Sequence, residues 1–399
     1  MLFKRKEFLQ LGSLATASML LPKFLKAFEN PLAVPPGNKV VVVLQLSGGN
    51  DGLNTVIPVR NDLYYKARPS LGIQRSQALS LTDEAGLNPA LTTFKELYDE
   101  GSLSIINNVG YPNPDRSHFR SMDIWHSASQ SDQYWHHGWL GRYLDAQCSG
   151  CDKPTQAIEI DDVLSLALKG KDMNGIAVKD PRRLYGTANE KFFKDVMKQH
   201  QSGGEEKPVD YLYKTMAETL SSADYIFKQS RLHPTAASYP GTELGNSFKT
   251  IASLIFSDIN TKVYYVSLGS FDTHVGQDDR QKRLFTEMND AVKAFVNDLK
   301  ANGRFNDVLL FTFSEFGRRV AQNASNGTDH GTANNMFLVS GALRKKGLVN
   351  AMPDLADLQE GDLKHKVDFK SVYATILNKW LSTDDAAILG AKYEQMDFV

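Results

Sequence analysis

Residues 39–54, KVVVVLQLSGGNDGLN, decide the fold of this chain. The first half, Val40–Leu46, is an almost unbroken apolar run rich in β-branched residues, which is typical of a strand buried on both faces of a parallel sheet. The second half, Ser47–Asn54, places three glycines and the carboxylate of Asp51 directly after that strand. Because open α/β sheets bind ligands at the carboxyl ends of their strands, Asp51 is predicted to lie at a functional site.

The rest of the chain alternates short apolar runs with helical patterns. Strands are predicted at Val40–Leu46, Leu103–Asn108, Val263–Leu268, Val308–Thr312 and Met336–Ser340. Helices are predicted at Pro89–Glu100, His118–Ser127, Asp279–Ala301 and Phe369–Leu381. This alternation predicts a three-layer α/β/α sandwich with a mostly parallel central sheet.

Between roughly residues 129 and 240 the pattern changes to polar, aromatic and helical segments, with a Gly/Glu-rich interruption at 201–206. We interpret this segment as an insertion, or cap, on a domain that spans 39–399. The 399 residues are 42% hydrophobic and 23% charged, which is ordinary globular composition. The formal charge of -1 and the lack of a basic stripe argue against a nucleic-acid partner.

The amino terminus has the features of an export signal. Lys4, Arg5 and Lys6 precede an uncharged, mostly apolar run from Phe8 to Pro22, as in the n- and h-regions of a signal peptide. The order Arg5-Lys6-Glu7-Phe8-Leu9 resembles a twin-arginine signal whose second arginine is lysine. We therefore expect a signal peptide at 1–29, a linker at 30–38 and a mature protein that is periplasmic, secreted or on the cell surface. An amphipathic surface helix and an uncleaved anchor are the alternatives.

Later runs are too short to span a membrane, and the mature chain is expected to have no membrane span. Cys148 and Cys151 form a single C-x-x-C. A structural zinc site requires a second ligand pair, so a local disulfide in an oxidising compartment is favoured over a redox pair or half a metal site.

Polar residues follow several of the predicted strands. Ser117 stands at the N-cap of the helix that begins at His118, where a hydroxyl meets amide donors and a dipole that favours anions. Arg116, His118 and Arg120 surround it in sequence and are candidate anion-holding groups. A plain helix cap with surface charge explains the same residues equally well.

Two further clusters follow the strands at 263–268 and 308–312. Asp272 and His274 lie two residues apart at a strand end and are able to turn toward one metal ion. Glu315 follows the other strand, and His330 lies in a nearby Asp-His-Gly turn. An ion pair between Glu315 and Arg318 and an ordinary turn are the competing interpretations.

The ordered set of motifs resembles an exported bacterial family, the domain of unknown function 1501. The motifs are SGGND51G, Ser117-His118-Phe119, Phe271-Asp-Thr-His274, Ser314-Glu-Phe-Gly-Arg318 and Asp329-His-Gly331. That family is similar to the alkaline phosphatase and sulfatase superfamily, and the resemblance covers essentially the whole mature chain. It implies one or two divalent ions at the carboxyl ends of the sheet, with zinc, manganese or iron compatible with mixed oxygen and nitrogen ligands.

The resemblance also implies roles for individual residues. Ser117 matches the nucleophile, assisted by Arg116 and His118. The predicted metal ligands are Asp51, Asp272, His274, Glu315 and His330. The predicted substrate-binding residues are Asn54, Arg120 and Arg318. The chain departs from the superfamily pattern at Glu315-Phe316, where Asp-His is usual, and this departure puts a second metal position in doubt.

The sequence therefore predicts a metal-dependent hydrolase of phosphate or sulfate esters, carried on a small molecule or a polymer. Two other classes stay open: an exported binding or assembly protein without catalysis, and a metal-dependent transferase or mutase.

Overall fold

A computed structural model describes residues 38–147, 155–191, 207–257 and 259–399. The predicted signal peptide, nearly all of the predicted linker, and Cys148 and Cys151 lie outside the described residues. Within the described chain, no helix combines the length and the apolar character needed to cross a bilayer.

The centre of the molecule is a nine-stranded sheet built around β1 (Val40–Leu46), in which all seven residues are buried. β1 pairs in parallel with β8 (Val263–Leu268) on one side and β9 (Val308–Phe313) on the other. The strand order is β11-β5-β10-β9-β1-β8-β6-β7, with β14 also paired to β5.

Only β10 (Asn334–Val339) runs against its neighbours in this described sheet, β9 and β5 (Leu103–Gly110). The other members are β6 (Ala157–Glu159), β7 (Ile176–Ala177), β11 (Gly347–Leu348) and β14 (Val367–Asp368). The predicted mostly parallel sheet is confirmed.

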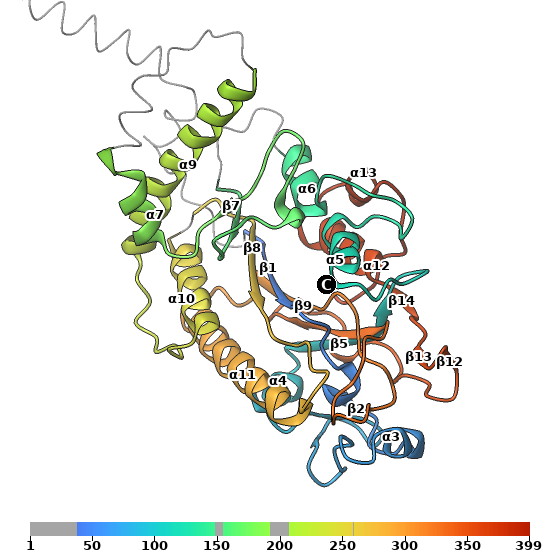
Figure 1. Ribbon diagram of the computed structural model, residues 1–399. Coiled ribbons are helices and arrows are strands. Elements are labelled where there is room, and N and C mark those ends of the chain that lie inside the picture. The colour runs from blue at the N-terminus through green and yellow to red at the C-terminus, as the bar shows by residue number, and fades with distance from the viewer. Residues whose placement is uncertain (1–37, 148–154, 192–206, 258) are drawn as a thin grey trace, which may run out of the picture.

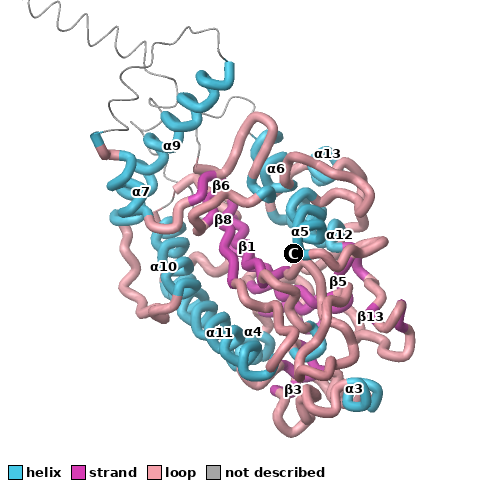
Figure 2. The backbone as a smooth tube through the Cα atoms, in the orientation of Figure 1, coloured by secondary structure: helices cyan, strands magenta, loops and turns pink. Residues whose placement is uncertain are grey.

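Helices cover both faces of the sheet (Figures 1 and 2). One core contains Val42 and Leu44 of β1 together with α4 (Thr92–Asp99), α10 (Glu243–Phe256) and α11 (Gln277–Ala301). The opposite core contains Val41 and Val43 together with α5 (His118–Ser127), α6 (Trp139–Gln147), α12 (Phe369–Thr375) and α13 (Asp385–Leu389). Alternate side chains of β1 thus enter different cores. Burial of each such side chain stabilises the fold by about 1.5–3 kcal/mol. This is the predicted α/β/α sandwich.

Part of the segment 129–240, which was predicted to be an insertion or cap, lies in the central sheet. β6 pairs in parallel with β8, and β7 pairs with β6, so this part of the chain extends the edge of the central sheet. α7 (Pro181–Ala188) packs against α9 (Lys207–Leu232) beside that edge (Figure 1). The run Ala157–Glu159 is short and fully buried, and it pairs with Val263–Tyr265 of β8.

Several short elements complete the described chain. They are the 3-10 helices η1 (Gly52–Asn54) and η2 (Leu166–Leu168), β2 (Val56–Ile57), α3 (Asp62–Ala67), β3 (Leu79–Ser80), β4 (Gly86–Leu87), β12 (Leu358–Gln359), β13 (Asp362–Leu363) and the π-helix η3 (Ile376–Trp380). The helix predicted over 369–381 is therefore split into α12 and η3. The helices α9 and α10 were not among the sequence predictions.

Candidate metal centre

The loops that follow β1, β8 and β9 pack tightly against one another. Gly48 and Gly49 of the first loop have φ angles of +118° and +77°, which favour glycine. A Cβ atom on Gly48 would lie 2.5 Å from the backbone nitrogen of Asp272, and one on Gly49 would lie 2.3 Å from the Phe316 ring. The glycine-rich turn after β1 therefore permits a close approach of three loops that lie far apart in sequence.

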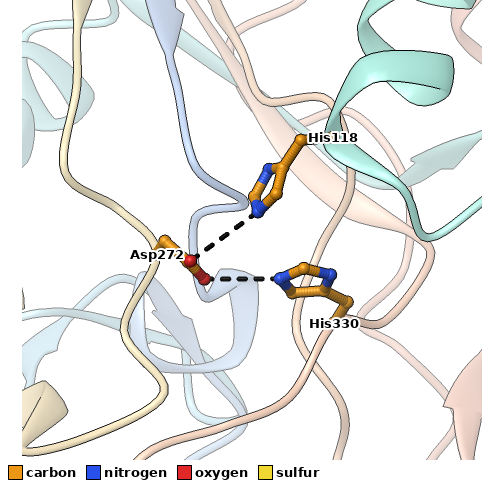
Figure 3. A group of neighbouring side chains, drawn as sticks. All are labelled: His118, Asp272 and His330. Atoms are coloured by element: carbon orange, nitrogen blue, oxygen red, sulfur yellow. Dashed lines mark hydrogen bonds and ion pairs between the residues drawn. The ribbon is translucent and has the colours of Figure 1, made fainter.

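Three side chains from different elements converge at this edge of the sheet (Figure 3). His118 begins α5, Asp272 follows β8, and His330 lies in the loop between β9 and β10. The Asp272 carboxylate lies between the two rings: Oδ2 is 3.7 Å from His118 Nε2, and Oδ1 is 3.3 Å from His330 Nε2. One ligand atom from each residue falls within 4.8 Å of the others.

His274 extends this cluster. Its Nε2 atom lies 3.1 Å from Asp272 Oδ1 and 3.0 Å from His330 Nε2. We call the four residues His118, Asp272, His274 and His330 the histidine cluster. Asp272 and His274 were predicted to share a metal ion, and the structure brings them together with the predicted His330.

The hydrogen bonds of the three rings fix which nitrogen faces inward. The Nδ1 atoms of His118, His274 and His330 lie 2.9 Å from Glu315 Oε1, 3.1 Å from Asp329 Oδ1 and 2.8 Å from the main-chain oxygen of Arg116. Because each of these partners is an acceptor, each Nδ1 carries the proton in the neutral ring. All three Nε2 lone pairs are then left for the inside of the cluster, as in metal sites where the second ring nitrogen bonds a carboxylate or carbonyl.

The donor set fits a divalent cation. Lone pairs on His274 Nε2, His330 Nε2 and Asp272 Oδ1, about 3 Å apart, repel one another unless a proton or a cation lies among them. Zinc bound tetrahedrally at about 2.0–2.1 Å separates its ligand atoms by roughly 3.3 Å. Imidazole nitrogen with one carboxylate suits zinc, iron and related metals.

Charge around the cluster shifts its pKa values in different directions. The Glu315 hydrogen bond raises the pKa of His118, while desolvation lowers the pKa of His330. Desolvation is the largest single effect on Asp272 and opposes ionisation, but Arg318 and the neighbouring histidines together outweigh it and lower the pKa of Asp272. Asp272 is therefore an anion at neutral pH, as a cation ligand requires.

Arg318 connects the loops that carry the cluster through hydrogen bonds to their main-chain oxygens. Its side chain is fully buried, and its guanidinium donates to main-chain oxygens of Gly48, Gly49, Phe271 and Thr328. A further bond, 2.7 Å long, joins Nη2 to Asp272 Oδ1. Arg318, predicted to bind substrate, is buried in this structure and bridges the loops through these hydrogen bonds.

Glu315, a predicted metal ligand, contacts the cluster through the Nδ1 atom of His118. Its buried carboxylate accepts bonds from the Gly48 backbone nitrogen at 2.8 Å and from His118. It orients the His118 ring.

Ser117, the predicted nucleophile, is exposed at the N-cap of α5, next to His118. Its hydroxyl makes no capping hydrogen bond to the helix. Arg116 pairs through its guanidinium with Asp362 and, at 3.6 Å, with Glu360, so its charge is partly neutralised. Its main-chain oxygen, by contrast, bonds a ring of the cluster.

Two of the predicted substrate-binding residues are engaged elsewhere. Arg120 donates to main-chain oxygens within 130–133 and stacks 3.8 Å from the Tyr134 ring centroid. Asn54 is fully buried, with its amide bonded to Leu71, Tyr64 and Arg68. Both side chains stabilise local structure in this conformation.

Asp51, the first predicted ligand, uses its carboxylate in a buried ion pair with Arg68. Arg68 gave no signal in the sequence, since it ends the short helix α3 in an ordinary polar stretch. Asp329 was predicted only as part of a turn, and His118 as an anion-holding and catalytic group rather than as a metal ligand. The hydrogen-bond acceptor at the Nδ1 atom of each histidine lies on a different loop, so the sequence gives no local signal for these pairs.

A cavity of about 650 Å³ is lined by residues next to the cluster in sequence or in contact with it, but by no member of the cluster itself. Arg116, Tyr111, Lys364 and His365 contribute to its lining, together with Phe316. The Phe316 ring also packs against the rings of His118 and His330, with centroids 4.9 and 4.5 Å apart. Phe316 therefore contacts two members of the cluster and also lines the cavity.

The fold and the cluster define an α/β protein with a histidine and carboxylate centre at the carboxyl ends of its parallel strands. The chain belongs to the family described as "Protein of unknown function (DUF1501)", whose sequence model it matches over residues 38–397. The resemblance inferred from the motifs is thereby confirmed. No curated protein matches the chain in sequence.

Solved structures with a similar arrangement include members of the sulfatase and alkaline phosphatase group. The PsFucS1 sulfatase from Pseudoalteromonas sp. is 12% identical, with 94% of this chain and 72% of that chain covered and a TM-score of 0.38. A protein in the alkaline phosphatase superfamily from Vibrio parahaemolyticus is 9% identical, with 91% and 69% covered and a TM-score of 0.32.

The lipoteichoic acid synthase LtaP from Listeria monocytogenes is also 9% identical, with 92% and 76% covered and a TM-score of 0.37. All three TM-scores lie below 0.5.

Proposed function

We propose that the protein is an exported, metal-dependent hydrolase of phosphate or sulfate esters. The observation that carries the proposal is the convergence of three Nε2 atoms on the Asp272 carboxylate, each ring held by an acceptor at Nδ1. The histidine cluster would hold one divalent ion. When bound, such an ion would supply positive charge that neutralises an anionic ester and lowers the pKa of a nearby hydroxyl.

Ser117 is the proposed nucleophile. Its exposed hydroxyl lies at the amino terminus of α5, where the helix dipole favours an anion, and it is not consumed by a helix cap. Its oxygen would form a bond to phosphorus or sulfur as the bond to the leaving alcohol breaks. Water would then cleave the seryl ester and release phosphate or sulfate.

The 650 Å³ cavity beside Phe316 is the proposed place for the rest of the substrate. Arg116 contributes to the lining of this cavity, and its guanidinium pairs with Asp362 and, at 3.6 Å, with Glu360. Export through the signal-like segment 1–29 would place the enzyme where phosphate or sulfate esters of surface polymers are accessible.

The first test is elemental analysis of the purified protein beside His330→Ala. His233→Ala is the matched control, because His233 is exposed and lies outside the cluster. We expect near-stoichiometric metal in the parent and in His233→Ala and its loss in His330→Ala. Equal metal in all three proteins, or none even after incubation with zinc and manganese, would refute the centre.

The second test separates catalysis from stability. Ser117→Ala should abolish hydrolysis of aryl phosphate or sulfate esters without lowering stability, because the hydroxyl makes no cap bond. Thr242→Ala is the control: Thr242 caps α10 by accepting from Gly245 N, so its loss should cost about 1 kcal/mol and leave turnover unchanged. Full activity in Ser117→Ala would exclude the proposed nucleophile.

A binding protein without catalysis is the second candidate. It is favoured by one observation: Asp51, predicted to be a ligand, is already neutralised by Arg68. Bound metal without turnover of any phosphate or sulfate ester would support this candidate. Turnover only in the presence of an acceptor alcohol would indicate a transferase instead.

A further inference from the structure

The carboxylate of Asp51 has no oxygen free for a cation. Oδ1 accepts from Arg68 Nη2 at 3.0 Å and from Leu53 N at 3.1 Å. Oδ2 accepts from Arg68 Nη1 at 2.5 Å and from the side-chain amide of Gln277. A carboxylate offers about four acceptor positions, and four donors meet them here. All these groups are buried.

Arg68 is equally satisfied. Besides its two bonds to Asp51, its guanidinium donates to Asn54 Oδ1 at 2.7 Å and to the main-chain oxygens of Val320 and Arg319, both at 2.9 Å. These are all five N–H donors of an arginine side chain. Pairing of this completeness offsets the cost of burying both charges, and removal of either partner would leave an uncompensated ion.

Gln277 connects this ion pair to the histidine cluster. Its amide nitrogen faces the Asp51 carboxylate, which only accepts, so its oxygen must face the opposite way. That oxygen accepts from Thr328 Oγ1 at 2.6 Å and from Thr273 Oγ1 at 3.2 Å. Both hydroxyls and the amide are buried.

The two threonines belong to the loops that carry the cluster. Thr273 lies between Asp272 and His274, and Thr328 lies two residues before His330. The loops also bond each other directly, with Thr328 N donating to the main-chain oxygen of Thr273 at 3.2 Å. A change at Asp51 is therefore transmitted through one amide to both loops.

We propose that Arg68 supplies the permanent positive charge beside Asp51 in place of a second metal ion, so that the centre holds a single divalent ion per chain. In this arrangement Asp51 and Gln277 are positioning residues that set the distance between His274 and His330. The inference rests on the proposed metal centre. It adds the number of ions bound per chain and the residues that position the metal ligands.

The experiment uses the purified full chain and two buried glutamines of α11 that lie one turn apart. Gln277→Met keeps the size of the side chain and removes the link between Asp51 and the two threonines. Gln281→Met is the matched control, because Gln281 Nε2 donates only to the main-chain oxygen of Asp51, at 3.2 Å. Metal content is measured by elemental analysis, and the dissociation constant for zinc by competition with a chelator.

We expect one ion per chain in the parent and in both variants. Loss of supporting bonds around metal ligands typically weakens binding by about 10- to 100-fold, so Gln277→Met should raise the zinc Kd by at least about tenfold. Gln281→Met should leave it within about twofold of the parent. Asp51→Asn, where it folds, should also retain one ion.

Failure has three distinguishable forms. Two ions in the parent, falling to one in Asp51→Asn, would make Asp51 a ligand and overturn the single-ion inference alone. Equal zinc Kd values for both glutamine variants would overturn the positioning role. No ion in the parent would instead overturn the proposed metal centre.

Discussion

The Nε2 atoms of His274 and His330 lie 3.0 Å apart, and each ring has an acceptor at its Nδ1 atom. Two neutral rings with protons on Nδ1 would point lone pairs at each other across this distance. The Asp272 carboxylate adds negative charge at the same point. A cation among these three atoms would remove the repulsion, so metal binding should be coupled to the stability of the fold.

The first prediction follows from that coupling. Zinc at about 100 times its Kd should stabilise the folded protein by about 2.7 kcal/mol, because it binds the native state alone. Thermal unfolding with and without zinc or EDTA measures the effect. His330→Ala should remove the zinc-dependent rise in Tm, and His233→Ala should keep it. A rise of the same size in His330→Ala would contradict the assignment of this ligand.

The second prediction concerns Gly48. Gly48→Ala should destabilise the protein by about 1–3 kcal/mol and weaken metal binding, because a Cβ atom would lie 2.5 Å from the Asp272 backbone nitrogen at a φ of +118°. Urea unfolding and zinc titration report the two effects. Gly269→Ala serves as the control in the neighbouring loop, since its Cβ would meet no atom within 4 Å. Unchanged zinc affinity in Gly48→Ala would show that the loop contact does not position Asp272.

The third prediction concerns the planar shape of Arg318. Arg318→Lys keeps the positive charge, but a lysine ammonium cannot replace the planar guanidinium that bonds five oxygens. Main-chain carbonyl groups would therefore lose their donors. We expect a loss of about 3 kcal/mol or more in the free energy of unfolding, measured in urea. Arg319→Lys, in a partly exposed side chain, should cost less than about 1 kcal/mol. Similar losses at the two positions would argue against loop bridging by Arg318.

The fourth prediction is a pH dependence that arises from a buried carboxyl group on β6. Burial raises the pKa of Glu159 from an ordinary value of 4.5 to about 7. Between these two values the folded protein retains a proton that the unfolded chain has released, so stability falls as pH rises. The fall amounts to about 3 kcal/mol between pH 4.5 and pH 7.

Glu159→Gln carries no titrating proton and should remove this fall, leaving a variant more stable than the parent at pH 8. Urea unfolding at pH 5 and pH 8 measures the difference. Glu190→Gln, at an exposed position, should retain the parental pH dependence. A parental profile that stays unchanged in Glu159→Gln would mean that this carboxyl titrates normally in the fold.

Strands and helices with strong periodic patterns were predictable from the sequence. The bounds of β8 and α5 agree with the predicted Val263–Leu268 and His118–Ser127, because hydrophobic periodicity and a cap residue are local signals. α10 was missed although it is strongly apolar, and β6 and β7 were missed because two- and three-residue strands carry almost no pattern.

The sequence by itself determined the family, the parallel sheet and which strand ends carry Asp272, His274 and His330. Those properties depend on composition and order along the chain. Only the tertiary structure decided that His118 faces these residues and that Asp51 faces Arg68. A carboxylate at a strand end is equally able to bind a metal ion or a guanidinium, and the choice depends on which side chain a distant loop delivers within about 3 Å.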